Sequence, residues 1–216
     1  MTSTCPYCSV ILEPPPKRSR TCPNCGQRIV VRTERGSGRK QFLTEQEGNR
    51  LDAERKAKAA RNKALQRLEW LGVTDQDFHV RERQLIEQWG AEPRPGDVFW
   101  SLANEQIALL GSERRWHELS MLYREMGLHL LDDGSPHHRL QRLAHEAELK
   151  HLLAGSQWGL EGRRRAVILA NACCNVCERL DGQVFTFDEA VDAMPLPSED
   201  CQRDWCNCSW SVTYLD

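Results

Sequence analysis

The chain has 216 residues, of which 40% are apolar and 28% are charged, so it can bury one modest core. Its longest aliphatic run, residues 166–170, is far shorter than the roughly 20 residues that span a bilayer, so we expect no membrane segment. The formal net charge of −2 conceals an asymmetry: residues 1–40 hold eight basic and two acidic residues, which leaves −8 for the remainder. This asymmetry indicates either a polyanionic partner for the N-terminal end or a solvated basic tail beside an anionic metal centre.

The ten cysteines lie only towards the two ends of the sequence, with none between Cys25 and Cys173. Residues 1–3 lead directly into the first cysteine pair without an apolar stretch, so we expect a cytoplasmic protein with reduced thiols. Spaced cysteine pairs in a reducing compartment indicate metal ligands rather than disulfides. The sequence therefore predicts a metal site, then helices, then a second metal site.

Residues 1–32 are the first expected domain. Two C-x2-C knuckles, Cys5 to Cys8 and Cys22 to Cys25, are separated by 13 residues, and each can present two sulfurs to one ion. This spacing predicts a closed, structural zinc site with Cys5, Cys8, Cys22 and Cys25 as ligands; an iron site of the rubredoxin kind and a redox pair are the alternatives. The segment resembles the zinc-ribbon family, which implies a small β fold held together by its metal.

Residues 33–43 are polar, basic and contain two glycines, so we expect a flexible linker. A helical domain is expected over residues 44–160. Thr44 and Glu47 form a capping box for a helix over about 45–71, and a second helix is expected over about 75–89.

Three further helices follow in this expected domain. Asp97 is the expected N-cap of the third, Ser112 opens the fourth and Gly134 ends it. Ser135 with Pro136 is expected to cap and begin the fifth. Short loops between these helices predict antiparallel neighbours, in an orthogonal bundle or an array of helical hairpins.

Residues 161–216 are the last expected domain, a small α+β module. A β run over 166–169 is expected to pair with a return strand over 184–187 through a turn at Asp181-Gly182. A short helix over about 188–193 follows. The whole chain is therefore expected to be mainly α, with a small N-terminal β zinc ribbon, a central multi-helix domain and a C-terminal α+β zinc-binding module.

The C-terminal cysteines are spaced less regularly than those of the ribbon. Cys174 and Cys177 form a C-x2-C knuckle, and the second pair must come from Cys201, Cys206 and Cys208. We favour Cys201 with one of the other two, Cys208 slightly ahead, while Cys173 is expected to pack nearby. A set of buried free cysteines is the alternative. In total we expect two zinc ions, one at each end of the chain.

The same segment carries a second resemblance. Cys174-x2-Cys177-x3-Asp181-Gly182-x2-Phe185, a proline-rich spacer and Cys206-x-Cys208 resemble the C-terminal module of phage head-morphogenesis (minor head) proteins. That module ends with a histidine before its final cysteines; this chain has none there, and Cys201 could replace it as a ligand. The resemblance implies a small metal-stabilised module more than it implies a role in a virion.

We expect no enzyme and no small-molecule substrate, because no catalytic arrangement is recognisable. His145 and His151 are six residues apart and do not share a helix face as a metalloprotease pair would. Neither a phosphate-binding loop nor a nucleophile elbow is present. All histidines fall in the helical middle, and His137 and His138 are expected to be exposed in the first turn of a helix: His79, His117, His129, His137, His138, His145 and His151.

The sequence therefore favours a non-catalytic zinc-binding adaptor or interaction protein. The basic ribbon would contact nucleic acid at its phosphates through Lys17, Arg18, Arg20, Arg28 and Arg32. A protein partner would use exposed tryptophans, of which Trp205 and Trp210 beside the last cysteines are the candidates, the others being Trp70, Trp89, Trp100, Trp116 and Trp158. A phage- or mobile-element-derived structural or morphogenesis protein, or an accessory factor of a nuclease, is the alternative.

Overall fold

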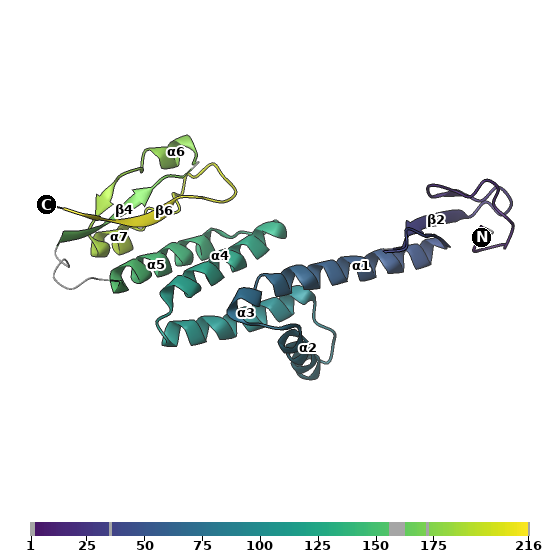
Figure 1. Ribbon diagram of the computed structural model, residues 1–216, viewed down its shortest axis with the longest axis horizontal. Coiled ribbons are helices and arrows are strands. Elements are labelled where there is room, and N and C mark those ends of the chain that lie inside the picture. The colour runs from purple at the N-terminus through teal and green to yellow at the C-terminus, as the bar shows by residue number, and fades with distance from the viewer. Residues whose placement is uncertain (1–2, 35, 156–162, 172, 216) are drawn as a thin grey trace. The chain divides into compact units, whose positions relative to one another are not determined.

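The computed structural model describes residues 3–34, 36–155, 163–171 and 173–215 (Figure 1). It confirms the expected fold class: the chain is mainly helical, with a three-stranded sheet near each end of the sequence. The chain divides into two compact units, Met1–Lys63 and Ala64–Asp216, which we describe separately. Among the described residues, no helix is long and apolar enough to cross a membrane. Trp158 and Gly159 lie outside the described residues.

The first unit is built on the antiparallel sheet β1-β2-β3. Its strands are β1 (Arg20–Thr21), β2 (Arg28–Thr33) and β3 (Lys40–Leu43). Its core is small, since only two cysteines, Leu12 and Ile29 are fully buried in the main cluster, with Phe42 packed partly against them. A core of this size cannot hold the segment folded by hydrophobic burial alone.

Strand β3 corrects one expectation. Residues 40–43 were expected to belong to a flexible linker, but they pair with β2 in the register Val30–Leu43 to Thr33–Lys40. The connecting turn contains Gly36 and Gly38, both with positive φ, a conformation that glycine adopts without steric cost. The turn allows Phe42 to return to the ribbon core, and this apolar burial makes the segment a strand.

The ribbon is held closely against helix α1 (Glu45–Gln66), whose first turn has the expected Thr44–Glu47 capping box. A Cβ atom on Gly48 would lie 2.6 Å from Val30, so this glycine allows α1 to approach β2. Arg32 makes a two-pronged ion pair with Asp52, at 2.9 and 2.5 Å, and Tyr7 accepts a hydrogen bond from the Glu45 amide. These contacts fix the ribbon on the first half of α1.

The second unit begins at Ala64, in the last turn of α1. A short 3-10 turn, η1 (Glu69–Leu71), closes on Gly72, which has positive φ, and the helices α2 to α5 follow. Their bounds are α2 (Asp75–Trp89), α3 (Pro95–Ser112), α4 (Trp116–Asp132) and α5 (His138–Ala154). Helices α4 and α5 lie side by side (Figure 1), and the buried core runs from Ala64 to Ala147. The predicted bounds of α2 are confirmed.

Three predicted helix starts are wrong. Asp97 is the third residue of α3, where its carboxylate accepts a hydrogen bond from the Arg94 amide. Helix α3 continues through Ser112, whose hydroxyl donates to the Leu109 carbonyl at the end of that helix. Ser135 likewise completes the end of α4 through its amide bond to the Leu130 carbonyl, so α5 begins only at His138. Polar residues of types that favour the N-cap position therefore lie here inside the first turn of a helix or at its C-terminal end.

The C-terminal module packs around the sheet β5-β4-β6. Its elements are β4 (Arg164–Leu169), α6 (Asn175–Glu178), β5 (Val184–Phe185), α7 (Phe187–Ala193) and β6 (Ser209–Tyr214). Strand β5 is shorter than the return strand expected over 184–187, because Thr186 already caps α7 in a capping box with Glu189. The core of this module includes Leu149 from α5, Ile168 and Trp210. The module is therefore packed on the helices as well as around its cysteines.

Candidate metal centres

The first centre consists of the four ribbon cysteines, whose sulfurs all lie within 4.8 Å of one another. The Cys5 and Cys25 sulfurs are 3.8 Å apart, and so are those of Cys8 and Cys22. Four sulfurs at about 2.3 Å from a zinc ion lie about 3.8 Å apart along the edges of a tetrahedron. The four side chains thus have the spacing of a tetrahedral zinc site, as predicted.

Two equivalent backbone turns bring these sulfurs together. In the first knuckle the Ser9 amide donates to the Cys5 carbonyl, and Ser9 has positive φ. In the second knuckle the Gly26 amide donates to the Cys22 carbonyl, and Gly26 has positive φ. A glycine follows Cys25 because glycine adopts this positive φ without steric cost.

Hydrogen bonds and burial separate the acidities of these thiols. The Asn24 side chain donates to the Cys8 sulfur over 3.4 Å and is the main cause that lowers the pKa of Cys8 to about 6. For Cys25 the Gln27 amide favours the thiolate, but burial and the neighbouring thiols outweigh it and raise the pKa to about 12. Converging thiols of this kind cannot all ionise unless a cation compensates their charge. A divalent ion would supply that charge.

The second centre gathers five of the six C-terminal cysteines. The sulfurs of Cys174, Cys177 and Cys201 lie within 4.8 Å of one another, and so do those of Cys177, Cys206 and Cys208. Individual distances are 4.0 Å from Cys174 to Cys201 and 3.8 Å from Cys177 to Cys206. The expectation of a C-terminal cysteine cluster is confirmed, and Cys201 belongs to it although no regular spacing places it there. Cys173 is half-buried beside Cys174 and belongs to neither group.

Short structural elements position the second set of sulfurs. Cys174 caps α6 and Cys177 lies within it, while Cys206 and Cys208 immediately precede β6. The backbone amides of Cys177 and Gln202 lower the pKa of Cys174 to about 6, whereas burial raises the pKa of Cys208 to about 12. As in the ribbon, amides that stabilise one thiolate lie next to thiols whose burial disfavours ionisation.

Residues of α4 and α5 hold the loop that carries the last cysteines. The buried Gln141 side chain donates to the Cys206 carbonyl over 2.9 Å, and the ring of His137 hydrogen-bonds the Asp204 carbonyl. The Trp205 ring stacks on His137 and lies so close to Gly127 that a Cβ there would be 2.9 Å away. His137 is therefore buried, which corrects the expectation that it is exposed.

Sequence reasoning missed Gln141, His137 and Gly127 as supports of the second centre. Gly127 and Gln141 lie on helices and His137 immediately precedes α5, all far from the cysteines in sequence, and no spacing connects them to a metal site. The adjacent His137 and His138 were visible as a feature, but nothing in the sequence pairs a helix start with a loop about 65 residues later.

The five basic residues predicted to contact nucleic acid differ in their surroundings. Lys17, Arg18 and Arg20 are exposed, and Arg28 is exposed opposite Glu45 at 3.8 Å. Arg32 is engaged with Asp52 in the ion pair that joins the ribbon to α1.

Of the six tryptophans that the structure describes, Trp89 alone is exposed, with 51% of its surface accessible. Trp210 is buried in the C-terminal module, and Trp205 packs on Gly127. Trp70, Trp100 and Trp116 pack against the helical core. The two tryptophans that flank the last cysteines are therefore structural residues.

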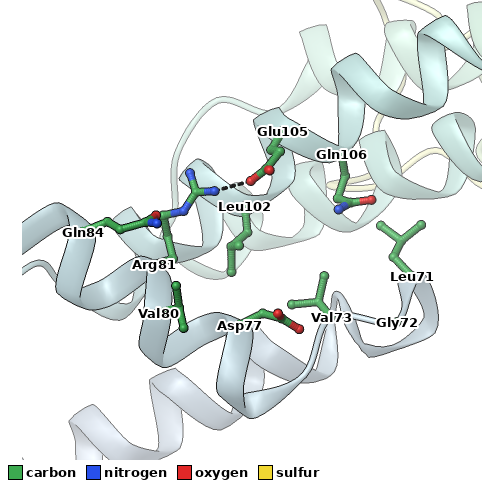
Figure 2. A pocket seen from close by; sticks show the side chains of 10 residues that line it. All are labelled: Leu71, Gly72, Val73, Asp77, Val80, Arg81, Gln84, Leu102, Glu105 and Gln106. Atoms are coloured by element: carbon green, nitrogen blue, oxygen red, sulfur yellow. Dashed lines mark hydrogen bonds and ion pairs between the residues drawn. The ribbon is translucent and has the colours of Figure 1, made fainter.

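A polar groove of about 380 Å³ lies between α2 and α3 (Figure 2). Leu71, Val73 and Leu102 supply its apolar lining, and Arg81 pairs with Glu105 across it, as the dashed line in Figure 2 shows. Arg81 also donates to the Ser101 hydroxyl over 2.9 Å. These bonds are internal to the helix pair, so the groove's most prominent charges are already paired with each other.

Comparison with known proteins adds no identification: no protein-family model, no curated protein and no solved structure matches the chain.

Proposed function

We propose that this protein is a non-catalytic, zinc-stabilised adaptor whose basic N-terminal unit binds the phosphate backbone of nucleic acid. The observation that carries the proposal is the division of charge between the two compact units. Residues 1–63 contain 14 basic and 6 acidic residues, a formal charge of +8, while residues 64–216 contain 15 basic and 25 acidic residues, a charge of −10. A positive field of this kind attracts a polyanion such as nucleic acid.

The exposed lysine and arginine side chains of this unit define the proposed contact surface. Lys17, Arg18 and Arg20 are exposed and have no acidic partner among the described residues. Lys56 and Lys58 on α1 are also exposed, Lys56 close enough to Asp52 to interact with its charge, and they extend the basic character of the unit beyond the ribbon. Arg32 would contribute indirectly, because its ion pair with Asp52 fixes the ribbon that carries the other bases.

The mode of binding follows from the scarcity of aromatic side chains. The unit has two aromatic residues: the Tyr7 hydroxyl is bonded to the Glu45 amide, and Phe42 is packed into the ribbon core. Tyr7 keeps 39% of its surface accessible, but a single exposed ring gives successive bases no continuous stacking platform. Binding should depend on phosphate contacts, fall steeply with salt and vary little with base sequence.

Fluorescence anisotropy with labelled duplex DNA, duplex RNA and single strands, at several salt concentrations, tests this proposal. The triple variant Lys17→Ala, Arg18→Ala, Arg20→Ala should weaken binding to every sequence, and should reduce the salt slope by about 0.9 for each lost phosphate contact. A matched control variant replaces three exposed arginines of the second unit, Arg83→Ala, Arg139→Ala and Arg142→Ala. It should bind nucleic acid as the parent protein does. Binding that is absent or insensitive to salt contradicts the proposal.

The metal part of the proposal is that each cysteine cluster holds a structural zinc ion. Four thiolates close the coordination of the first ion, which leaves no position for a reacting water. Native mass spectrometry of the whole protein should find at least two zinc ions per chain. A single ion would remove the second centre from the proposal, and a protein free of metal at both centres would overturn it.

For the second unit we propose a protein partner, and Trp89 with its neighbour Ile86 near the end of α2 offers the exposed apolar side chains. A photoreactive side chain at position 89 should crosslink to one defined polypeptide, and the same group at the exposed Arg142 should not. Equal crosslinking from both positions contradicts a specific surface at Trp89.

The alternative is a structural or morphogenesis protein of a phage or mobile element, or an accessory factor of a nuclease. It is favoured by one observation: the C-x2-C knuckle and the C-x-C pair that resemble minor head proteins come together in one cluster. Neighbouring genes for capsid or packaging proteins would support this alternative, and neighbours of unrelated function would weaken it.

A further inference from the structure

The C-terminal cysteines are grouped differently from those of the ribbon. In the ribbon, all four sulfurs lie within 4.8 Å of one another, as one tetrahedral ion requires. At the C-terminal centre, five sulfurs within the described residues form two groups of three, and both groups contain Cys177. The arrangement has one sulfur more than a single tetrahedral ion can use, and a shared sulfur at its middle.

We propose that the C-terminal centre holds two thiophilic ions, with the sulfur of Cys177 bridging them. A thiolate has several lone pairs, so it can bind two soft cations at once, and zinc is the soft divalent ion that thiolate sites commonly select. This inference rests on the proposed function in one respect, namely that the C-terminal cysteines bind metal at all.

The ligands of the two ions come from both sides of Cys177. Cys174 and Cys201 would complete the first ion's set, and their sulfurs are 4.0 Å apart. Cys206 and Cys208 would complete the second set, in which the sulfurs of Cys177 and Cys206 are 3.8 Å apart. Both distances are close to the edge of about 3.8 Å expected for sulfurs on one zinc ion. Each ion would have three thiolates and one further coordination position.

Charge and burial favour a second cation. Cys177 and Cys208 are fully buried and Cys206 is 3% exposed, so any negative charge on them lies in the core of the module. Five thiolates around one divalent ion would leave a net charge of −3, whereas two ions reduce it to −1, less than the −2 of the ribbon site. Uncompensated charge in an apolar interior is costly, so a second ion stabilises the fully ionised cluster.

The stoichiometry of the whole protein tests the proposal directly. Native mass spectrometry after equilibration with excess zinc, followed by removal of the free ion, should find three ions per chain: one in the ribbon and two at the C-terminal centre. Two ions per chain would overturn the bridged pair while leaving the proposed function intact. One ion would remove the C-terminal centre from the proposed function and none would overturn the metal part of it, so the two failures are distinguishable.

Single substitutions sharpen this count. Cys208→Ser removes a ligand of the second group only and should lower the stoichiometry from three ions to two; Cys201→Ser should do the same through the first group. Cys173→Ser is the matched control, because Cys173 belongs to neither group, and it should retain three. Retention of three ions by Cys208→Ser would overturn the assignment of that ligand set.

A spectroscopic measurement on the unmodified protein does not depend on whether any variant folds. Cobalt(II) in place of zinc gives a high-spin resonance at an isolated thiolate site, and two cobalt ions that share a sulfur couple and lose intensity. At three equivalents the signal should equal that of one isolated ion, because the coupled pair contributes little. A signal equal to that of three isolated ions, or saturation at two equivalents, overturns the bridge.

Discussion

The two candidate metal centres of this protein offer the same ligand chemistry on different scaffolds. The ribbon places its four cysteines on two equivalent knuckles around a core of a few side chains. The C-terminal centre is embedded in a larger core that includes Leu149, Ile168 and Trp210, and helices α4 and α5 support its last loop. A centre of the first kind creates its fold, whereas a centre of the second kind completes a fold that other contacts also stabilise.

The largest expected effect follows removal of the ribbon metal. Cys22→Ser leaves three thiolates, and structural zinc in small domains contributes roughly 10 kcal/mol or more to folding. Hydrogen exchange should show loss of protection over β1 to β3 with α2 to α5 unchanged. The matched variant Cys206→Ser should keep protection in β4 and α5, because Leu149, Ile168 and Trp210 still pack together in their core. Full protection of β2 in Cys22→Ser would show that the comparison is wrong.

The next effect tests how far the helices support the second centre. Gln141→Ala removes the buried donor to the Cys206 carbonyl, and an unsatisfied buried carbonyl costs about 1–3 kcal/mol. Thermal unfolding of the zinc-loaded protein should show this loss. Arg142→Ala, an exposed neighbour on the same helix, should stay within about 0.5 kcal/mol of the parent protein. A neutral Gln141→Ala would mean that the metal alone holds the loop.

A smaller effect is expected at the contact between Gly127 and Trp205. The added methyl group of Gly127→Ala would lie 2.9 Å from the indole ring, and the resulting displacement should cost about 1–3 kcal/mol, part of which the better helix propensity of alanine offsets. Near-ultraviolet circular dichroism should report the moved ring. In Gly111→Ala the new methyl group meets no atom within 4 Å, so this control should be stabilised by up to about 1 kcal/mol.

The smallest effect concerns the ion pair that fixes the ribbon on α1. The Arg32 guanidinium lowers the pKa of Asp52 below its ordinary value. A depressed folded-state pKa stabilises the fold above the unfolded-state value, and that contribution is lost as the pH falls through the folded-state pKa. Both side chains are about a third exposed, so solvent screens the pair and the effect on stability should be small. Carboxyl titration by NMR should show the Asp52 pKa rising towards its ordinary value in Arg32→Ala; an unchanged pKa would contradict this assignment.

The sequence predicted features that depend on local chemistry. The two ribbon knuckles, the capping boxes at Thr44 and Thr186 and the bounds of α2 require only neighbours a few residues apart. The features it missed depend on residues far apart in the chain. Phe42 turns a polar, glycine-containing stretch into a strand by packing on the ribbon, and Ser135 closes the end of α4 although its side chain suits the start of a helix.

The second centre shows the same limit. Its C-x2-C knuckle was recognisable, but the choice among Cys201, Cys206 and Cys208 depends on the path of a loop between α7 and β6. That path is set by Gln141, His137 and Trp205, which pack through tertiary contacts. No spacing rule encodes contacts of this kind, so the grouping of five sulfurs around Cys177 became visible only in the structure.

The order of the cysteines along the chain also determines which centre can bind metal first during synthesis. The ribbon sulfurs lie within residues 5–25, so the first ion can bind as soon as the first strands leave the ribosome. The other centre needs Cys174 and Cys208 together with the Gln141 support, so it can close only after the residues up to Cys208 have been synthesised. A cell short of zinc during synthesis would therefore accumulate chains with a finished ribbon and an unfinished C-terminal module.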